Sequence, residues 1–503
     1  MSRLGITADM IYRPILAVIV LVASAAFGVV PQPETMTAGE GVFQIKSAQI
    51  TGPDGRGLRA AVELLKLQTT QSGDSAAISL KLDPSASALG AEGYELNVTD
   101  KKVQITAMKD AGLFYGVQTL AQLVDGSTIP AVHIIDKPRF PYRGYKLDSC
   151  RHMQSKQYIK QLIDQLSALK INRFHWHLTE DQGWRIEIKK YPKLTEIGSY
   201  REKDGQRYGG FYTQADIREV VQYAEDHCMV VIPEIEMPGH SSAALSAYPW
   251  LGCTGGPYKV RWEWGISEDV YCAGKETTYE FCENVLDEVM QLFPNSPVIH
   301  IGGDECPKSR WHACPNCQAM IKEKHLKDEN ALQGYFTSRI AHYLADHGRR
   351  LQGWNEIMEG TDLPPGVIVQ QWSAPNSARD AARAGLDVVC SPTTNCYFDY
   401  GLDTTPTEKV YAFEPIPADL QPELNAHILG PQANVWTEGI VTEKDVQRMT
   451  FPRIAALAEV GWSEKKSRNW SDFQTRMTHY IATQPEDQRE GWAERMKTPA
   501  AKK

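Results

Sequence analysis

The chain has 503 residues, of which 42% are hydrophobic and 23% are charged, so it can build a large apolar core and has room for two domains. Its formal net charge of −9 at pH 7 excludes a general nucleic-acid binder, because such a protein needs a basic face. We therefore expect a globular protein without a nucleic-acid partner.

The N-terminal segment has the pattern of an export signal. Arg3 and Arg13 precede the apolar run "PILAVIVLVASAAFGVV" at 14–30, which has small residues at 24–26. This pattern predicts a secretory signal peptide over residues 1–30 and a periplasmic or extracellular protein, with a short membrane anchor or a misassigned start as alternatives. No other stretch has the roughly 20 apolar residues of a membrane helix, so we expect no stable membrane span after signal removal.

Residues 31–138 have the pattern of a small α/β domain, of the α+β sandwich kind. The stretches at 93–100 and 102–108 alternate apolar and polar residues, which predicts strands. The stretch "AGLFYGVQTLAQLV" at 111–124 has the spacing of a helix. A joint with two prolines, "IIDKPRFPYRG" at 134–144, then ends the domain.

Residues 139–485 alternate short apolar runs with helix-length amphipathic runs. In "QYIKQLIDQLSALK" at 157–170 the apolar residues fall on one helix face, and 215–227 and 279–293 behave alike. Repeated strand–helix units predict an α/β fold, a (β/α)8 TIM barrel. A doubly wound sheet is the alternative, but "KLDSCRHM" at 146–153 lacks its glycine-rich turn. We expect a polar tail over 486–503. The predicted strands lie within 143–148, 171–178, 229–236, 297–305, 349–356, 367–372, 387–392 and 428–436.

Acids, histidines and aromatic residues follow almost every predicted strand. Active sites of this barrel lie at the C-terminal ends of the strands, so these side chains should converge. Aromatic faces stack on sugar rings and carboxylates accept hydrogen bonds from hydroxyls, which favours a carbohydrate site. The alternative is that the tryptophans pack, His240 is structural, and Glu234 and Glu236 are solvated. The set comprises Asp148, Arg151, His175, His177, Glu180, Asp181, Glu234, Glu236, His240, Asp304, Glu305, Trp354, Asn355, Glu356, Trp372, Tyr397, Asp399, Trp436 and Glu438.

The stretch "HIGGDE" at 300–305 places two carboxylates side by side. Adjacent residues in a strand point to opposite faces, so Asp304 and Glu305 need not share a site. Gly302 and Gly303 free the backbone just past the strand, however. We therefore predict that both side chains turn toward one ligand.

Several motifs resemble those of the family 20 glycoside hydrolases, the β-N-acetylhexosaminidases. They are "HIGGDE" at 300–305, "LDSCRH" at 147–152, "FHWHLTEDQGWR" at 174–185, "PEIEMPGH" at 233–240 and "NVWTE" at 434–438. The resemblance covers about 140–480, and the domain before it also fits the family. It implies an exo-acting hydrolase of glycans that end in a β-linked N-acetylhexosamine. It also implies a retaining mechanism without a cofactor, in which the substrate acetamido group is the nucleophile.

The resemblance also assigns roles to single residues. Glu305 would be the general acid and later the base, Asp304 would orient the acetamido N–H, and Tyr397 would donate to the acetamido oxygen. His240 would contact Glu305 and be held by Glu180, although relatives often have two aspartates where this chain reads "TED", so Asp181 could share that role. The implied sugar-binding set is Arg151, Asp181, Trp354, Trp372, Asp399, Trp436 and Glu438.

The chain has ten cysteines, all between Cys150 and Cys396. Export permits disulfides, so we predict a bridge from Cys253 to Cys272 and another from Cys306 to Cys314 or Cys317. The alternative is structural zinc at Cys306, His312, Cys314 and Cys317, whose spacing is typical of zinc ligands. With disulfides favoured, we assign no metal.

Three questions stay open on the sequence. An inactive or merely carbohydrate-binding relative is the alternative function, which the intact Asp304–Glu305 pair disfavours. The motifs do not separate N-acetylglucosamine from N-acetylgalactosamine. A homodimer is compatible with the sequence.

Overall fold

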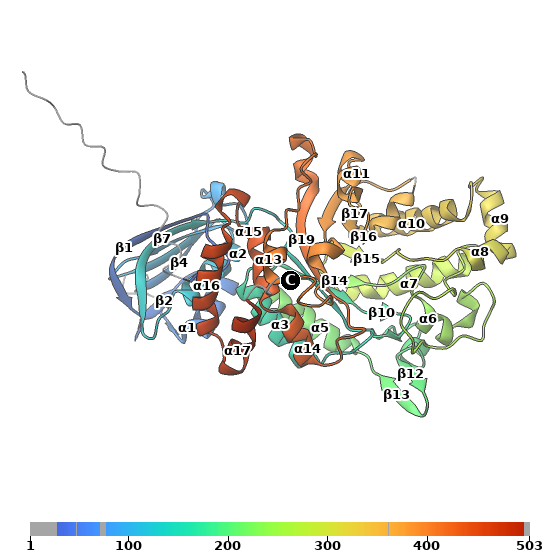
Figure 1. Cartoon of the computed structure of the whole chain (residues 1–503), viewed down its shortest axis with the longest axis horizontal. Coiled ribbons are helices and arrows are strands. Elements are labelled where there is room, and N and C mark those ends of the chain that lie inside the picture. The colour runs from blue at the N-terminus through green and yellow to red at the C-terminus, as the bar shows by residue number, and fades with distance from the viewer. Residues whose placement is uncertain (1–27, 47, 71–76, 361, 497–503) are drawn as a thin grey trace, which may run out of the picture.

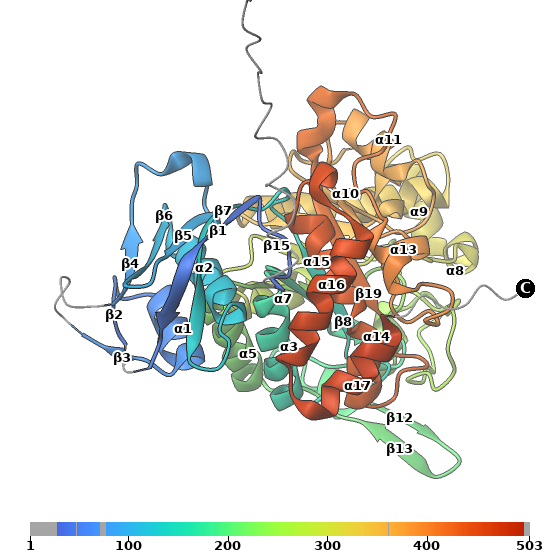
Figure 2. The same cartoon turned by 60° about the vertical axis from the view of Figure 1, so that its left-hand side comes forward.

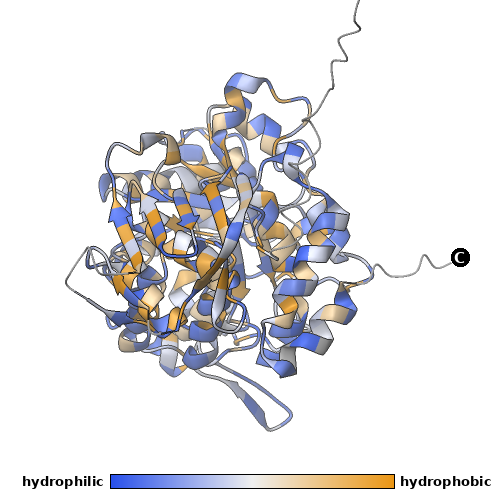
Figure 3. Cartoon of the chain, turned by 90° about the vertical axis from the view of Figure 1, so that its left-hand side faces the viewer, coloured by the Kyte–Doolittle hydropathy of each residue, from blue (hydrophilic) through white to orange (hydrophobic). Residues whose placement is uncertain are grey.

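The computed structural model describes residues 28–46, 48–70, 77–360 and 362–496, and the chain forms two domains (Figure 1). The first contains a seven-stranded sheet in the order β1-β7-β5-β6-β4-β2-β3. Its strands carry alternating hydrophobic and hydrophilic bands, as expected for a sheet with one covered face (Figure 3). The strands are β1 (Thr35–Gln44), β2 (Gln49–Thr51), β3 (Gln68–Thr69), β4 (Ile78–Leu82), β5 (Tyr94–Val98), β6 (Val103–Ala107) and β7 (Thr128–Asp136).

Two helices cover this sheet. Helix α2 (Asp110–Gln122) packs on β4, β5 and β6, and α1 (Arg56–Leu65) packs against α2. The predicted strands at 93–100 and 102–108 and the predicted helix at 111–124 therefore correspond to β5, β6 and α2. A short 3-10 helix, η1 (Ser87–Leu89), lies in the connection before β5.

The second domain is a closed barrel of eight parallel strands, which confirms the predicted TIM barrel. Each strand lies within one of the eight predicted runs, because buried parallel strands are continuous apolar segments that polar residues end. The strands are β8 (Gly144–Asp148), β9 (Arg173–His177), β14 (Val230–Glu234), β15 (Val298–His300), β16 (Arg350–Trp354), β17 (Ile368–Gln371), β18 (Asp387–Cys390) and β19 (Ile428–Val435).

Helices surround the barrel, and two short hairpins interrupt its connections. The hairpin β12 (Tyr200–Lys203)–β13 (Gln206–Gly209) extends away from the body, whereas β10 (Thr179–Glu180)–β11 (Gly183–Trp184) is buried (Figure 2). The helices are α3 (Lys156–Ala168), α4 (Lys193–Glu196), α5 (Gln214–Asp226), α6 (Ser242–Ala247), α7 (Glu276–Leu292), α8 (Ser309–Ala313), α9 (Pro315–Glu323), α10 (Glu329–Asp346), α11 (Ser377–Arg383), α12 (Thr393–Cys396), α13 (Thr407–Tyr411), α14 (Glu443–Thr450), α15 (Arg453–Trp462), α16 (Trp470–Ala482) and α17 (Glu486–Arg495), with 3-10 turns η2 (Pro249–Leu251), η3 (Asn355–Glu359), η4 (Pro422–His427) and η5 (Lys465–Ser467).

A buried polar cluster joins the two domains. Asp136 at the end of β7 accepts from Lys170 Nζ (3.0 Å) and from Tyr94 Oη (2.6 Å) through Oδ2. Its Oδ1 accepts from Trp462 Nε1 (2.8 Å) and from the backbone of Glu34 (3.1 Å). We call these residues the Asp136 cluster. Since Asp136 and Lys170 are both fully buried and paired, they fix the first domain on the barrel.

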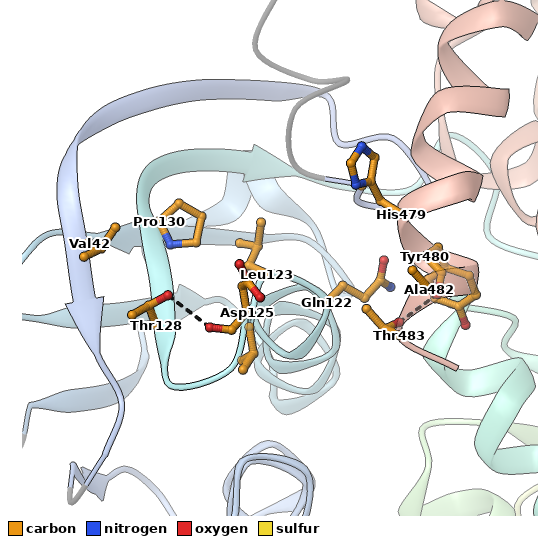
Figure 4. A pocket seen from close by; sticks show the side chains of 12 residues that line it. Val42, Gln122, Leu123, Asp125, Thr128, Pro130, His479, Tyr480, Ala482 and Thr483 are labelled. Atoms are coloured by element: carbon orange, nitrogen blue, oxygen red, sulfur yellow. Dashed lines mark hydrogen bonds between the residues drawn. The ribbon is translucent and has the colours of Figure 1, made fainter. Parts of the chain in front are cut away.

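A groove also lies between the domains, and Figure 4 shows it. The loop after α2 lines one side with Leu123 and Asp125, and α16 lines the other with His479 and Thr483. Its volume is about 510 Å³. None of the predicted strand-end residues lines this groove, so it is not the site that the sequence predicts.

The described residues cover part of each end of the chain. Residues 1–27 of the predicted signal lie outside the described residues. The last residues of its apolar run are part of the fold: Val29 is fully buried in the core of the first domain and Val30 in that of the barrel. Residues 486–495, predicted as part of a polar tail, form α17, whose Trp492 stacks on Phe451 with ring centroids 4.6 Å apart. Among the described residues, no helix is both long and apolar enough to cross a membrane.

The predicted disulfides are not formed, since all ten cysteines are free. The sulfur atoms of Cys253, Cys272, Cys314 and Cys317 form one group, which does not include Cys306. The pairing of Cys306 with Cys314 or Cys317 was therefore wrong: Cys306 Sγ contacts the carbonyl of Pro307 instead. His312 is exposed and pairs with Glu329.

Candidate active site

The loop after β15 turns two adjacent carboxylates toward one histidine. Gly302 and Gly303 have φ angles of 69° and 95°, which favour glycine, and Glu305 itself has φ 44°. His240 Nε2 lies 3.9 Å from Asp304 Oδ2 and 3.6 Å from Glu305 Oε2. The glycines thus release the chain from strand geometry, as the sequence predicted, and both acids face His240.

His240 is a buried cation held from its other side. Its Nδ1 lies 2.8 Å from Glu180 Oε1 and 3.9 Å from Asp181 Oδ2. Burial alone would lower the pKa of His240, but the ion pair with Glu180 and the nearby Asp304 raise it to about 10. Glu180 therefore contacts His240 despite its extra methylene.

Asp181 is held by contacts with the surrounding loops. It is fully buried, Oδ1 accepts from the backbone N–H of Ser242 (2.9 Å), and Oδ2 lies 3.3 Å from Arg261 Nη1. Burial, followed by the neighbouring Glu180, raises its pKa. Its contacts hold the surrounding loops together.

Arg151 anchors a second buried ion-pair group at the end of β8. Its Nη2 lies 2.9 Å from Glu180 Oε2 and its Nη1 lies 3.4 Å from Asp148 Oδ2. Burial would raise the pKa of Glu180, but Arg151 and His240 outweigh it and hold that pKa well below its usual value. The guanidinium also lies over the Trp436 ring, 4.9 Å from its centroid.

Four aromatic rings lie at the strand ends around these acids. The Trp354 and Trp436 centroids are 5.8 Å apart, and those of Trp372 and Tyr397 are 6.4 Å apart with nearly parallel planes. Trp372 Nε1 donates to Glu356 Oε2 (3.1 Å), which fixes the ring. These rings supply the apolar faces that a sugar ring needs.

Four carboxyl groups of the site have raised pKa values. Burial, opposed by His240 and reinforced by Glu305, raises the pKa of Asp304 to about 6. Burial and the neighbouring Glu438 raise the pKa of Asp399 to about 7. Burial and the neighbouring Asp304 raise the pKa of Glu356 to about 7. Burial also raises the pKa of Glu438, although Arg151 opposes it. Perturbed acids gathered at one end of a barrel are typical of an active site.

Several buried polar atoms at the strand ends have no hydrogen-bond partner in the described chain. They are Arg151 Nε, Asp304 Oδ1, Trp354 Nε1 and Asp399 Oδ1. Buried polar atoms usually have partners because leaving them unpaired costs free energy. The strand ends therefore offer donors and acceptors to a polar ligand.

A charged network centred on Glu234 supports the site from below, and the sequence reasoning missed one of its members, Lys146. Glu234 lies 3.2 Å from Lys146 Nζ, 3.2 Å from His175 Nε2 and 3.0 Å from His300 Nδ1, and it also bonds His177. The hypothesis that Glu234 and Glu236 are solvated was wrong, since both are buried. Lys146 was overlooked because it lies inside a strand, and only its place among buried apolar neighbours in "GYKLD" could have indicated it.

Glu236 explains why residue 302 is a glycine. A Cβ atom at Gly302 would lie 1.7 Å from Glu236 Oε2. Burial and the nearby Asp304 and Glu234 raise the pKa of Glu236 well above its usual value. The charged form of Glu236 is therefore disfavoured beneath Asp304.

Comparisons with known proteins agree with this geometry. The family model "Glycosyl hydrolase family 20, catalytic domain" matches residues 140–465, and that for domain 2 of the same family matches residues 26–137. A beta-hexosaminidase of Porphyromonas gingivalis is 42% identical over 89% of this chain, which spans 62% of that relative. A beta-hexosaminidase of Vibrio furnissii is 36% identical, over 88% of this chain and 77% of the relative.

Solved structures give the same result. A family 20 exo beta-N-acetylglucosaminidase of Vibrio harveyi in complex with N-acetylglucosamine has a TM-score of 0.83 at 33% identity, covering 93% of this chain and 78% of that one. A beta-N-acetylhexosaminidase of Bacteroides fragilis has a TM-score of 0.80 at 36% identity, covering 88% and 93%. With two family models in succession and a barrel whose strand ends carry the acids, the chain belongs to glycosyl hydrolase family 20.

Proposed function

We propose that this protein is an exo-acting β-N-acetylhexosaminidase that removes terminal, non-reducing β-linked N-acetylglucosamine or N-acetylgalactosamine from glycans. The observation that carries the proposal is the adjacent Asp304–Glu305 pair facing His240. The names of the relatives support it, and the Vibrio harveyi structure holds N-acetylglucosamine.

In the proposed reaction Glu305 protonates the glycosidic oxygen while the substrate acetamido oxygen attacks the anomeric carbon. The C–O bond to the leaving group breaks, and a bond to the acetamido oxygen forms an oxazolinium ion. Glu305, now a carboxylate, takes a proton from a water molecule whose oxygen attacks the anomeric carbon. The bond from that carbon to the acetamido oxygen breaks, which restores the acetamide and gives a product of retained configuration. This route belongs to the substrate-assisted exceptions among glycosidases.

Asp304 and Tyr397 would control the acetamide. The Asp304 carboxylate would accept the acetamido N–H and stabilise the positive charge that develops there. The Tyr397 hydroxyl would donate to the attacking oxygen; it is buried, and burial raises its pKa well above the usual value, so it stays a donor. Groups fixed before reaction at the site of developing charge give large rate enhancements.

His240 would let Asp304 and Glu305 lie side by side once Glu305 has given up its proton. Its positive charge would offset the repulsion between the two carboxylates. Arg151 would bind the 3- and 4-hydroxyls, Glu438 the 4-hydroxyl and Asp399 the 6-hydroxyl, and the free atoms of Arg151 and Asp399 support this. Trp354, Trp372 and Trp436 would surround the sugar.

We also propose that the protein acts outside the cytoplasm. The pattern at 14–30 supports export, and its first part lies outside the described residues. In the periplasm or outside the cell the enzyme would meet glycans that do not enter the cytoplasm.

A panel of 4-nitrophenyl β-glycosides with and without the 2-acetamido group tests the proposal. We expect turnover of N-acetylglucosaminide and N-acetylgalactosaminide and none of the plain glucoside or galactoside, because these lack the nucleophile. Asp304→Asn should remove most turnover of the acetamido sugars. Equal rates on glucoside and N-acetylglucosaminide would contradict the mechanism, and sugar binding without any turnover would indicate a binding protein instead.

A further inference from the structure

Four cysteines from two separate segments meet behind the site. Cys253 and Cys272 come from the connection between α6 and α7, and Cys314 and Cys317 flank the start of α9. The sulfur atoms all lie within 4.8 Å of one another. Cys272 Sγ lies 3.6 Å from both Cys314 Sγ and Cys317 Sγ, and Cys317 Sγ lies 3.9 Å from Cys253 Sγ.

These distances match a tetrahedron of thiolates around one metal ion. Zinc–sulfur bonds of about 2.3 Å place the sulfurs of a tetrahedral site about 3.8 Å apart. A disulfide instead needs one partner at about 2.05 Å. Here Cys272 and Cys317 each have two sulfur neighbours at similar distances, so no pair is singled out.

The backbone brings the two segments together independently of the sulfur atoms. A Cβ atom at Gly274 would lie 2.2 Å from the carbonyl carbon of Asn316 and 2.3 Å from the nitrogen of Cys317, so only glycine permits this approach. Trp311 Nε1 donates to the carbonyl of Tyr271 (2.8 Å). The cysteine group is thus built into a packed junction.

Four sulfur atoms this close together cannot all ionise without a cation, because neighbouring thiolates repel one another. A bound divalent cation would let all four ionise.

We propose that Cys253, Cys272, Cys314 and Cys317 bind one structural Zn²⁺ ion. Four thiols would release four protons and form a closed, four-coordinate site with no open position for catalysis. Sulfur-only tetrahedral coordination favours zinc among the abundant divalent ions, and iron is the other metal that such a site takes.

The proposed zinc would brace two loops of the active site. The connection that carries Cys253 and Cys272 reaches Asp181, whose carbonyl accepts from the backbone N–H of Arg261 (3.1 Å). Helix α8, which precedes Cys314, begins four residues after Glu305. The metal would thus hold the segment behind the Asp304–Glu305 pair against the loop beside His240.

Metal analysis of the full-length protein, purified without chelator, tests the proposal directly. We expect about one zinc per chain by plasma mass spectrometry and almost none in the double variant Cys314→Ser/Cys317→Ser. Cys306→Ser is the matched control, because it lies in the same stretch outside the group, and it should keep its zinc. A thiol-blocking mercurial should release the zinc to a chromogenic chelator.

Other outcomes would overturn the proposal, and wild-type protein suffices to see them if the double variant does not fold. Absence of metal with a non-reduced mass about 4 Da below the thiol form would mean two disulfides. Absence of metal with four thiols that react freely with iodoacetamide would also overturn it. Stoichiometric iron, visible as a coloured protein, would overturn the assignment to zinc.

Discussion

The Asp136 cluster and the strand-end site both gather charged residues from distant parts of the sequence, yet they differ in how far their buried hydrogen-bonding atoms are satisfied. Both oxygens of Asp136 have two partners each, and Lys170 is paired. In the site, Asp304 Oδ1, Asp399 Oδ1 and Arg151 Nε have none in the described chain. A closed network holds domains together, whereas an open one is prepared for a ligand.

The pKa values of two acids in the site reflect its open network. In the site, burial without enough partners raises the pKa of Asp304 to about 6 and that of Asp399 to about 7. Burying these carboxyl groups destabilises the folded state but brings their pKa values close to neutral pH, where they can exchange protons. Changing one residue in each region should separate activity from stability.

The largest effect should come from Glu305→Gln, which removes the proposed acid without altering size. We expect kcat to fall by about 10²- to 10⁴-fold on substrates with poor leaving groups, the range typical of general acid catalysis. The fall in the rate of bond cleavage should be smaller for a dinitrophenyl glycoside, because that leaving group needs no proton. Stopped assays on both substrates measure this.

The control for Glu305→Gln is Glu323→Gln, an exposed residue on α9 that pairs only with Lys324 among the described residues. It should leave kcat unchanged. An equal loss on both leaving groups would remove Glu305 from the role of the acid.

Asp136→Asn should test the closed network. It leaves the buried Lys170 charge without its carboxylate, and breaking a buried pair costs about 3–5 kcal/mol. We expect a clearly lower thermal midpoint by calorimetry, with kcat/KM at 25 °C unchanged. Asp226→Asn, which breaks the exposed pair with Arg59, should cost at most about 1 kcal/mol. If Asp136→Asn lost activity but kept its thermal midpoint, the Asp136 cluster would not differ from the site in the way described.

The smallest effect is a shift in pH dependence. Asp304 must be ionised in the proposed role, so kcat/KM should decline as the pH falls through about 6. The charge of His240, which lies 3.9 Å away, lowers that pKa, so His240→Gln should move the decline to higher pH by about 1 to 3 units. His312→Gln, at an exposed position, should not move it. A pH–rate profile of each variant decides.

Strand ends could be predicted from the sequence because apolar runs there stop at polar residues. This pattern was enough to find the eight strands and to gather His240, Asp304 and Glu305 as candidates. The turn at Gly302 and Gly303 could be predicted for the same local reason. Predictions succeeded where the cause lies within a few residues.

Predictions failed where burial depends on segments far apart in the chain. Lys146 lies inside a strand and is paired only because Glu234 comes from another strand. Cys253 and Cys272 meet Cys314 and Cys317 through a close approach at Gly274 that no spacing reveals. Val29 is apolar like the run before it, yet it belongs to the core.

The short strand β15 has a consequence for how this enzyme can change during evolution. Asp304 and Glu305 share one peptide, so any insertion or shift in that loop moves the proposed acid and the proposed acetamide-binding group together. Variation in substrate preference must therefore come from other loops around the barrel, such as those that carry Trp372, Asp399 and Glu438. The β15 loop should keep its length while its neighbours diversify.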